Sequence, residues 1–314
     1  MRKSTGFFYL LILAGTLLCK GCGDSPQVIV FHAGSLSRLM SDLKAGFEAA
    51  NPGVEVILEA SGSIPACRKT SELHRQADII AVSDSQVIER LLYPKFSDWS
   101  LVFAGNKMGI AYGEHSKYGE EINSDNWFEI LSRKDVKLGR ADPDLDPCGY
   151  RTLFCWKLSD VFYQEKLAGK SIAASLEANC PPANMRPFEL ELVALLQSYA
   201  LDYVFIYESI ARQFNLKFVD LPDKINLGTT TEAAFYSSVD FQVNGGGEKE
   251  FTVSGQQICY AFTIPESAPH PQLALKFGEF MLKSREISDN FYQTVEAASL
   301  HPENLPRELR KLLP

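Results

Sequence analysis

The sequence predicts an α/β fold in two lobes, and three observations lead to this prediction. Short apolar strands alternate along the chain with amphipathic helices, a pattern typical of sheets covered by helices. The roughly 290 residues that follow the N-terminal leader exceed what one ordinary hydrophobic core accommodates. Gly34-Ser35 and Gly62-Ser63 each lie directly between a predicted strand and a predicted helix. These turns are therefore expected at the carboxyl edge of one parallel sheet.

The first residues have the features of a secretory signal. Arg2 and Lys3 supply a positive start, and the apolar run Phe7–Cys19 that follows is too short to span a bilayer. We therefore expect residues 1–22 to be a signal peptide and the mature protein to lie in the cell envelope.

The end of this segment resembles a bacterial lipoprotein signal. Cys22 follows the small residue Gly21, so Cys22 is expected to be lipidated and to become the mature N-terminus. Cys19 is the alternative lipidation site, and a soluble secreted protein cut near Gly23 is the simpler alternative. With a lipid anchor, the protein would lie on the outer face of the cytoplasmic membrane or in the periplasm.

The charge of the chain excludes one class of partner. Removing residues 1–21 takes away three cations and no acid, so the formal net charge moves from −8 to −11. No basic block or interleaving of aromatic and basic residues occurs, and nucleic acid is therefore not an expected partner. An acidic protein that binds an anion must do so through local dipoles, because its overall field repels the ligand.

The remaining cysteines do not indicate a metal site. They show no CxxC pairing and no ligand spacing with histidine, which argues against zinc. An oxidising exterior permits one or two disulfides, an odd number leaves at least one thiol free, and the pairing stays open. The cysteines are Cys67, Cys148, Cys155, Cys180 and Cys259.

Strand–helix units follow one another in the first part of the chain. Buried strands are predicted at Val28–Phe31, Val54–Leu58 and Ala77–Val82, and each precedes an amphipathic helix. Three such units in succession predict a parallel sheet.

The pattern restarts after an extended segment, Leu101–Tyr112, which Gly105-Asn106 interrupts. The elements predicted there are helices at Trp127–Leu131, Gly149–Leu158, Leu190–Leu196 and Ser209–Phe214, and strands at Val136–Gly139 and Tyr203–Tyr207.

The end of the chain is expected to return to the first lobe. Gly245-Gly246-Gly247 indicates a hairpin tip, Ile258–Ile264 reads as a strand, and the helices around 270–298 have strongly apolar faces. The segment from Leu300 onward is expected to be a surface tail. The predicted boundaries are residues 23–104 for the first lobe, 105–259 for the second, and 260–314 for the return and the tail.

Serines at the two Gly-Ser turns are candidates for binding an anion. A helix N-terminus offers unpaired N–H groups and the positive end of the helix dipole, and Ser35 or Ser63 adds a hydroxyl donor. The alternative is that both serines are only helix caps.

The second lobe contributes further candidates. Asp146-Pro147 has the form of an N-cap followed by Pro at the first helical position. Cys148 has no histidine nearby in sequence to activate it as a nucleophile. Glu189 lies on an apolar-rich helix, where a carboxylate is either solvated or functional, and Tyr207 ends a strand and is expected to point into the cleft.

Five segments carry a specific likeness when they are taken together and in order. They resemble the molybdate/tungstate-binding proteins of ABC importers, in particular the archaeal-type tungstate-binding branch. The likeness extends from about residue 27 to about residue 285, and the block DPCGYR is its most specific part. The segments are Phe31–Leu36, Glu59–Ser63, Ala77–Ala81, Asp146–Arg151 and Leu201–Tyr207.

The resemblance implies the type II periplasmic-binding-protein fold, in which each lobe is a mainly parallel sheet flanked by helices and the ligand lies in the cleft. It implies that Ser35 and Ser63 hydrogen-bond the oxyanion, together with backbone N–H groups around Gly34. Tyr207 and the backbone near Cys148 would contribute from the second lobe.

The same resemblance implies that two carboxylates, Asp146 and Glu189, bind the metal centre of the oxyanion directly and make it six-coordinate. The sulfur of sulfate cannot imitate this, so the carboxylates would also select the ligand. Glu191 lies two residues on and is the alternative second carboxylate. The two residues are about 200° apart around the helix, so only one of them can face the cleft.

The function that follows is capture of tungstate or molybdate between two lobes and delivery to an ABC permease and its ATPase, without catalysis and without a cofactor. The alternatives are a receptor for sulfate, phosphate or ferric iron, or an envelope hydrolase that uses Cys148 or Ser35. No GxSxG segment surrounds a serine, which argues against the hydrolase. The sequence does not separate tungstate from molybdate and does not indicate an oligomeric state.

Overall fold

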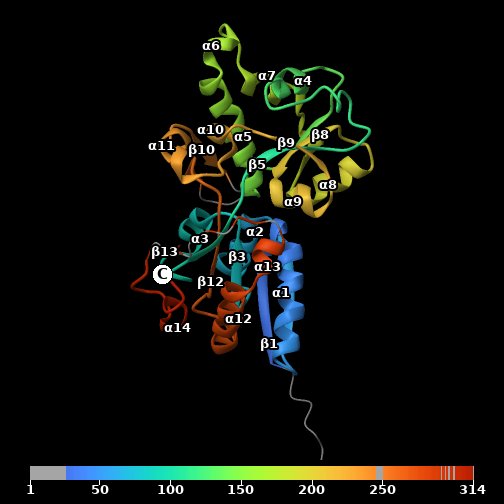
Figure 1. Ribbon diagram of the computed structural model, residues 1–314. Coiled ribbons are helices and arrows are strands. Elements are labelled where there is room, and N and C mark those ends of the chain that lie inside the picture. The colour runs from blue at the N-terminus through green and yellow to red at the C-terminus, as the bar shows by residue number, and fades with distance from the viewer. Residues whose placement is uncertain are drawn as a thin grey trace, which may run out of the picture.

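The computed structural model describes residues 26–244, 250–290 and 301–313, together with 292, 293, 295, 298 and 299. Cys19, Cys22 and the glycines predicted at the hairpin tip lie outside these residues. Two lobes, each built on its own sheet, are stacked end to end with the first lobe at the bottom of Figure 1. In the part of the chain described, no helix has the length and apolar character needed to cross a membrane.

The first lobe is built on a six-stranded sheet of order β13-β4-β12-β3-β1-β2. Strand β1 pairs in parallel with β2 and β3, whereas β12 runs antiparallel to β3 and β4. The strands are β1 (Gln27–Ala33), β2 (Glu55–Ser61), β3 (Ile79–Val82), β4 (Leu101–Gly105), β12 (Cys259–Thr263) and β13 (Ala298–Ser299).

The first lobe contains helices from both ends of the chain. In α1 the apolar residues Leu39, Met40, Leu43 and Phe47 are buried, and Phe47 packs edge-on against Phe277 of α12 with ring centroids 5.1 Å apart. The lobe contains the 3-10 helix η1 (Gly34–Leu36) and the helices α1 (Ser37–Ala50), α2 (Ser63–Ser71), α3 (Ser85–Leu92), α12 (Pro271–Lys283), α13 (Glu286–Asp289) and α14 (Arg307–Arg310).

The prediction that the segment after Leu300 is a surface tail is wrong. This segment forms α14, and Leu305 and Leu309 are buried against the first lobe. A methyl group on Gly278 of α12 would lie 3.5 Å from the Leu309 side chain, which shows how closely the two helices approach. The segment therefore completes the hydrophobic core of the lobe.

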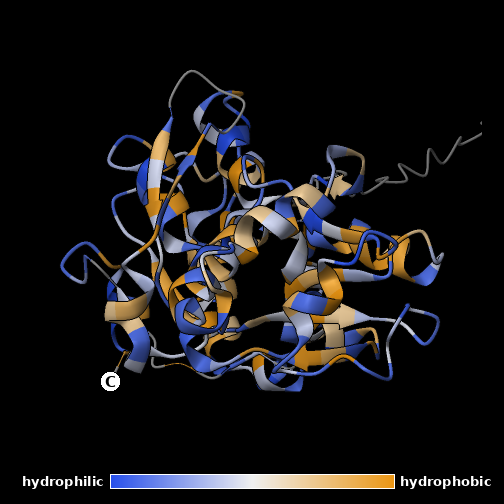
Figure 2. Cartoon of the chain, turned by 90° about the horizontal axis from the view of Figure 1, so that it is seen from above, coloured by the Kyte–Doolittle hydropathy of each residue, from blue (hydrophilic) through white to orange (hydrophobic). Residues whose placement is uncertain are grey.

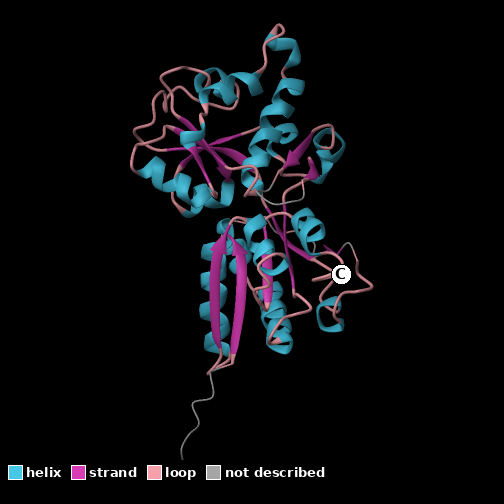
Figure 3. Cartoon of the chain, turned by 180° about the vertical axis from the view of Figure 1, so that it is seen from behind, coloured by secondary structure: helices cyan, strands magenta, loops and turns pink. Residues whose placement is uncertain are grey.

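The second lobe has a five-stranded sheet of order β7-β6-β8-β5-β9 (Figure 3). Strand β6 is parallel to β7 and β8, and β5 is antiparallel to β8 and β9. The strands are β5 (Met108–Tyr112), β6 (Leu138–Ala141), β7 (Met185–Arg186), β8 (Tyr203–Tyr207) and β9 (Lys217–Asp220), and a separate antiparallel ribbon is formed by β10 (Asp240–Val243) and β11 (Phe251–Ser254).

Helix α5 is the central helix of the second lobe, and most of its residues are buried. Trp127 and Trp156 pack edge-on against Phe205 of β8, with ring centroids 5.8 and 5.7 Å away. Figure 2 shows apolar residues concentrated on the packed helices and strands, while the outer loops are hydrophilic. The helices are α4 (Trp127–Leu131), α5 (Pro147–Phe162), α6 (Gln164–Leu167), α7 (Ile172–Asn179), α8 (Glu189–Gln197), α9 (Glu208–Gln213), α10 (Asp223–Asn226) and α11 (Ala233–Tyr236), with 3-10 turns η2 (Pro182–Asn184) and η3 (Thr230–Glu232).

The chain crosses between the lobes twice, from β4 to β5 and from β11 to β12. The two-lobed α/β fold is confirmed, and both sheets are mixed because the crossing strands run antiparallel to their neighbours. The lobe boundaries expected after residues 104 and 259 stay predictions.

Candidate functional site

Four strand-to-helix or loop-to-helix turns meet where the two lobes face each other. The first lobe contributes the turn at Gly34 after β1 and the turn at Gly62 after β2. The second lobe contributes the starts of α5 and α8, where Asp146 is the N-cap of α5 and Glu189 is the first residue of α8. Each start presents backbone N–H groups that no helix bond satisfies.

The lobes are in direct contact on both sides of these turns. A methyl group on Gly62 would lie 2.5 Å from the carbonyl oxygen of Leu145 and 3.4 Å from Oδ2 of Asp146. A methyl group on Gly34 would lie 2.8 Å from the ring of Phe188. The structure is therefore a closed form in which the two glycines permit the close approach.

Asp146 and Glu189 bring two carboxyl groups into this closed interface. The amide of Cys148 donates a hydrogen bond of 2.8 Å to Oδ1 of Asp146, as expected for an N-cap. Oδ2 of Asp146 and both carboxyl oxygens of Glu189 are buried and have no hydrogen-bond partner among the described residues. Glu189 is fully buried whereas Glu191 is partly exposed, so Glu189 is the carboxylate that lies in the interface.

Burial perturbs the acidity of both groups. It raises the pKa of Asp146 to about 6, although the Cys148 amide and the positive charge of Arg151 oppose the change. It also raises the pKa of Glu189 well above its usual value, and the negative charge of Asp146 adds to this, while the backbone N–H of Glu189 itself opposes it. Two carboxyl groups that interact in a dry site are destabilised as a pair of anions.

The two serines are buried in the same cluster, and neither is a helix cap. The Ser35 hydroxyl has no hydrogen-bond partner among the described residues. The Ser63 hydroxyl lies 3.0 Å from the Ser83 hydroxyl and accepts a hydrogen bond of 3.1 Å from the Ser83 amide. Helices α1 and α2 have Leu36 and Gly62 at their N-caps, without a side-chain cap. The reading of both serines as caps is therefore wrong.

Tyr207 and Cys148 lie in the second-lobe wall of the cluster. Tyr207 ends β8, is fully buried, and accepts a hydrogen bond of 2.9 Å from Nη1 of Arg151. The Cys148 thiol faces the carbonyl of Phe205 at 3.8 Å, and burial raises its pKa well above the usual value. The thiol therefore stays protonated and lacks the thiolate character that a nucleophile needs.

Sequence reasoning missed a buried ion pair next to these residues. Nη2 of Arg151 lies 3.1 Å from Oδ2 of Asp84, and both side chains are only 2% exposed. Tyr150 donates a hydrogen bond of 2.7 Å to the same Asp84 oxygen. The signal for this pair in the sequence is Arg151 itself, a cation on a helix whose other residues are mostly apolar.

The arrangement differs from a resident metal centre. No cluster of three or more His, Cys, Asp and Glu side chains suitable for holding a metal ion occurs in the described ranges. The five described cysteines outside the signal segment are all free, so none of them forms the disulfides that the sequence left open.

The chain matches the model of one protein family along most of its length. The family is described as bacterial extracellular solute-binding protein, and the match covers residues 28–289. An uncharacterized solute-binding protein from Petrotoga mobilis is 42% identical, with 98% of this chain and 96% of the relative aligned. The molybdate/tungstate-binding protein WtpA from Pyrococcus abyssi is 36% identical, with 100% of this chain and 99% of the relative aligned.

Solved structures show the same fold at low sequence identity. The periplasmic molybdate-binding protein of Azotobacter vinelandii aligns with a TM-score of 0.59 at 14% identity and covers 85% of this chain and 99% of its own. The sulfate-binding protein SubI of Mycobacterium tuberculosis aligns with a TM-score of 0.60 at 13% identity and covers 86% of this chain and 88% of its own. These structures confirm the two-lobed periplasmic-binding-protein type II fold.

Proposed function

Since the chain belongs to the family of bacterial extracellular solute-binding proteins, we propose that its ligand is tungstate or molybdate. Membership of this family makes the chain a solute-binding protein of an ABC transporter, and it confirms the prediction that the chain is not an enzyme. The choice of ligand rests on the chemistry of the buried cluster.

The observation that carries the proposal is the pair of buried carboxyl groups with three oxygens that have no hydrogen-bond partner in the part of the chain described, one on Asp146 and two on Glu189. A buried carboxylate is strongly destabilising unless a hydrogen bond, an opposite charge or a metal compensates it. Sulfate or phosphate would place a further negative charge beside the pair. Mo(VI) or W(VI) is a hard, oxygen-seeking centre that accepts carboxylate oxygens as ligands. Asp146 and Glu189 would then complete a six-coordinate centre.

The oxo groups of the ligand would be held by donors from both lobes. The Ser35 hydroxyl, which has no protein partner among the described residues, would donate one hydrogen bond, and Ser63 with the first amides of α2 would donate others. Backbone N–H groups near Gly34 and the hydroxyl of Tyr207 would complete the set. The Cys148 amide already donates to Asp146, so we assign it the role of orienting that carboxylate.

Transport would follow from closure. The closed lobes bury the ion and present one joint surface, which would dock on a membrane permease driven by a cytoplasmic ATPase. A lipid on Cys22, which lies outside the described residues, would keep the protein near the permease at the outer face of the membrane.

Isothermal titration of the mature protein, beginning at Gly23, tests the proposal with tungstate, molybdate, sulfate and phosphate as ligands. Asp146→Asn and Glu189→Gln are the test variants, and Glu191→Gln is the matched control on the same helix. We expect tungstate and molybdate to bind and both test variants to lose at least about a hundredfold in affinity, as expected when a metal ligand or its support is removed. Glu191→Gln should bind normally.

Two results would contradict the proposal in different ways. Equal binding of sulfate or phosphate would make the cluster a general anion site. Tungstate affinity that is unchanged in both test variants would remove the carboxylates from the ligand set.

A further inference from the structure

The side chain of Arg151, in the second lobe, contacts the first lobe directly behind the proposed ligand site. Nη1 of Arg151 donates a hydrogen bond of 2.6 Å to the carbonyl oxygen of Ser83, and Nη2 lies 3.1 Å from the carboxylate of Asp84. Ser83 and Asp84 form the turn between β3 and α3, and Ser83 is also the hydrogen-bond partner of Ser63. Arg151 therefore contacts the wall of the site from behind.

The same guanidinium contacts the second-lobe side of the site. Nη1 donates a hydrogen bond of 2.9 Å to the hydroxyl oxygen of Tyr207. A guanidinium has donors and no acceptor, so the Tyr207 oxygen accepts and its own proton has to be directed elsewhere. Burial raises the pKa of Tyr207 well above its usual value, and the hydroxyl therefore keeps that proton.

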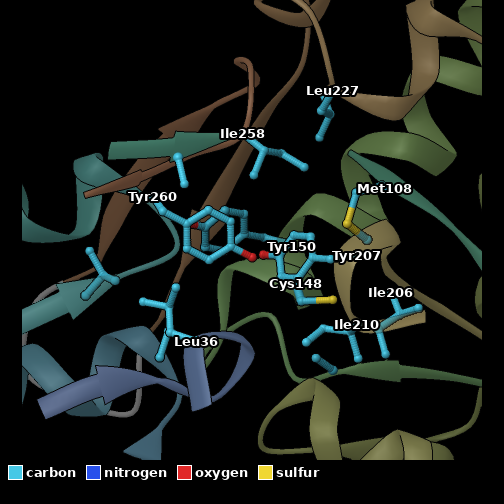
Figure 4. Packing of buried hydrophobic residues seen from close by; sticks show 14 of the residues in the cluster. Leu36, Met108, Cys148, Tyr150, Ile206, Tyr207, Ile210, Leu227, Ile258 and Tyr260 are labelled. Carbon is cyan, nitrogen blue, oxygen red and sulfur yellow. The ribbon is translucent and has the colours of Figure 1, made fainter. Parts of the chain in front are cut away.

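The surroundings of Tyr207 restrict where the proton can point. The Tyr207 ring packs edge-on against the ring of Tyr260 from β12, with centroids 5.9 Å apart, and Figure 4 shows both residues among buried apolar side chains. Tyr260 has its own partner, since it accepts a hydrogen bond of 3.2 Å from the amide group of Asn106. Because the Tyr207 oxygen accepts a hydrogen bond from Arg151, the Tyr207 hydroxyl is left to donate its own proton toward the site.

We propose that Arg151 is a positioning residue for the bound oxyanion, which it serves by fixing the Tyr207 hydroxyl as a donor once the lobes have closed. The inference rests on the proposed function, because it assigns Tyr207 to the same ligand. Asp84 neutralises the charge of Arg151, so Arg151 acts through direction rather than through attraction of the anion. Because its anchors Ser83 and Asp84 belong to the first lobe, the positioning is complete only in the closed form.

The competing explanation is that Arg151 only clamps the lobes together. A clamp and a positioning residue differ in their dependence on Tyr207. If Arg151 acts through the Tyr207 hydroxyl, removing that hydroxyl abolishes most of the effect of an Arg151 substitution. If Arg151 is only a clamp, the two effects on affinity multiply.

The test is a double-mutant cycle of tungstate affinity with Arg151→Met, Tyr207→Phe and the double variant, measured by calorimetry on the mature protein. We expect each single variant to lose about tenfold to a hundredfold, the range for one charge-assisted hydrogen bond. The double variant should be no weaker than the weaker single variant. Arg212→Met is the control, because Arg212 is bonded to Glu208 of its own helix and lobe.

A spectroscopic readout separates positioning from simple structural loss. Tungstate should change the ultraviolet absorbance of tyrosine in the wild-type protein, and Tyr207→Phe should remove this change. Arg151→Met should remove it too, even at saturating tungstate, since the hydroxyl would no longer be directed to the ligand. Arg151→Met with Asp84→Asn guards against misfolding, because it leaves no unpaired buried charge.

The outcomes distinguish the two proposals. Multiplicative losses of affinity, or a full tyrosine signal in Arg151→Met, would overturn the role of Arg151 while wild-type binding stands. Absence of tungstate binding by the wild-type protein would overturn the proposed function itself.

Discussion

Gly62 of the first lobe faces the carbonyl oxygen of Leu145 in the second lobe so closely that a methyl group on Gly62 would lie 2.5 Å from that oxygen. Leu145 directly precedes Asp146, and Gly62 directly precedes Ser63, so this contact joins the two halves of the proposed site. The obstacle for a larger residue is backbone, which cannot move aside as the end of a flexible side chain can. Closure of the lobes therefore depends on the absence of a side chain at position 62.

Gly62→Ala should weaken tungstate binding while leaving the fold intact. The backbone at Gly62 has φ −62° and ψ 156°, which suits alanine, so the open form should tolerate the methyl group. In the closed form, overpacking of this kind typically costs about 1–3 kcal/mol, or roughly tenfold to a hundredfold in affinity. Calorimetry measures the affinity, and small-angle scattering with and without tungstate measures closure.

Gly113→Ala is the control for this substitution. A methyl group there would be 4.0 Å from its nearest neighbour, the Ser116 hydroxyl, so binding and closure should be unchanged. Normal affinity in Gly62→Ala would show that the lobes do not need to approach this closely.

Glu189→Gln should stabilise the protein in the absence of ligand. The buried carboxyl of Glu189 has no hydrogen-bond partner among the described residues, and its neighbour is a second carboxyl group. Replacing a poorly compensated buried charge often stabilises a fold by about 1–4 kcal/mol. Urea denaturation at neutral pH measures the free energy of unfolding.

The same variant should lose the stabilisation that tungstate gives the wild-type protein. A ligand present at a hundredfold its dissociation constant stabilises by about 2.7 kcal/mol. Glu191→Gln, which is partly exposed, should alter neither quantity. An unliganded Glu189→Gln protein that is less stable than wild type would mean that the carboxylate has a structural partner.

The elements that could be predicted from sequence are those with strong local signals. Helix Trp127–Leu131 and strand Tyr203–Tyr207 have the predicted bounds, and Asp146-Pro147 is the predicted N-cap and first helical residue. The sequence predicts that strand β2 ends at Leu58, but it continues to Ser61, because Glu59–Ser61 pair in parallel with Phe31–Ala33 of β1. Arg75 compensates the charge of Glu59 with hydrogen bonds of 2.7 and 2.6 Å. A charged residue such as Glu59 makes an edge strand hard to recognise from sequence, because the residue that compensates its charge comes close only in the folded protein.

The residues of the candidate site that could be predicted from sequence are those whose own local context indicates a role. Ser35, Ser63, Asp146 and Glu189 each begin or precede a helix, and the structure brings them together. The pairing of Arg151 with Asp84 was not predictable, because the two residues belong to different lobes and meet only when the lobes close. Leu309 was missed for a similar reason, as its contact is with α12 rather than with nearby residues.

The four buried thiols, Cys67, Cys148, Cys155 and Cys180, should be inert in the folded protein, and a reducing agent should not change its melting temperature. All five are free, and burial raises the pKa of Cys180 to about 11 and that of Cys67 and Cys155 further. Alkylation of the native protein should reach Cys259 first, because it is the one of the five that is not fully buried.

Mass spectrometry after brief alkylation identifies the modified residue, and Cys259→Ala is the control that should remove the first adduct. A drop in melting temperature on reduction would reveal a disulfide and contradict the free state of these cysteines.

His32 should make the protein less stable in mild acid. It is buried at the end of β1, and Nδ1 lies 2.8 Å from the carbonyl oxygen of Ala33. Burial lowers the pKa of His32 from 6.5 to about 4, although the carbonyl opposes this. Between these two values the unfolded chain binds a proton that the folded chain does not, so stability falls as the pH decreases from 6.5 to 4. Below pH 4 both states are protonated and the loss is complete, at about 3 kcal/mol at most.

Replacing His32 isolates this contribution from the buried carboxyl groups. The raised pKa of Asp146 gives the opposite slope, because the folded state then holds a proton that the unfolded chain releases between about pH 4 and 6. The difference in unfolding free energy between wild type and His32→Gln, measured in urea at pH 7 and pH 5, cancels the Asp146 contribution. We expect wild type to lose more stability than the variant over this interval, and His115→Gln, at an exposed position, to behave as wild type. An equal loss of unfolding free energy in wild type and His32→Gln would mean that folding does not lower the pKa of His32. His32 would then be protonated in the folded protein at pH 5, and the strand β1 beside the proposed site would carry a positive charge.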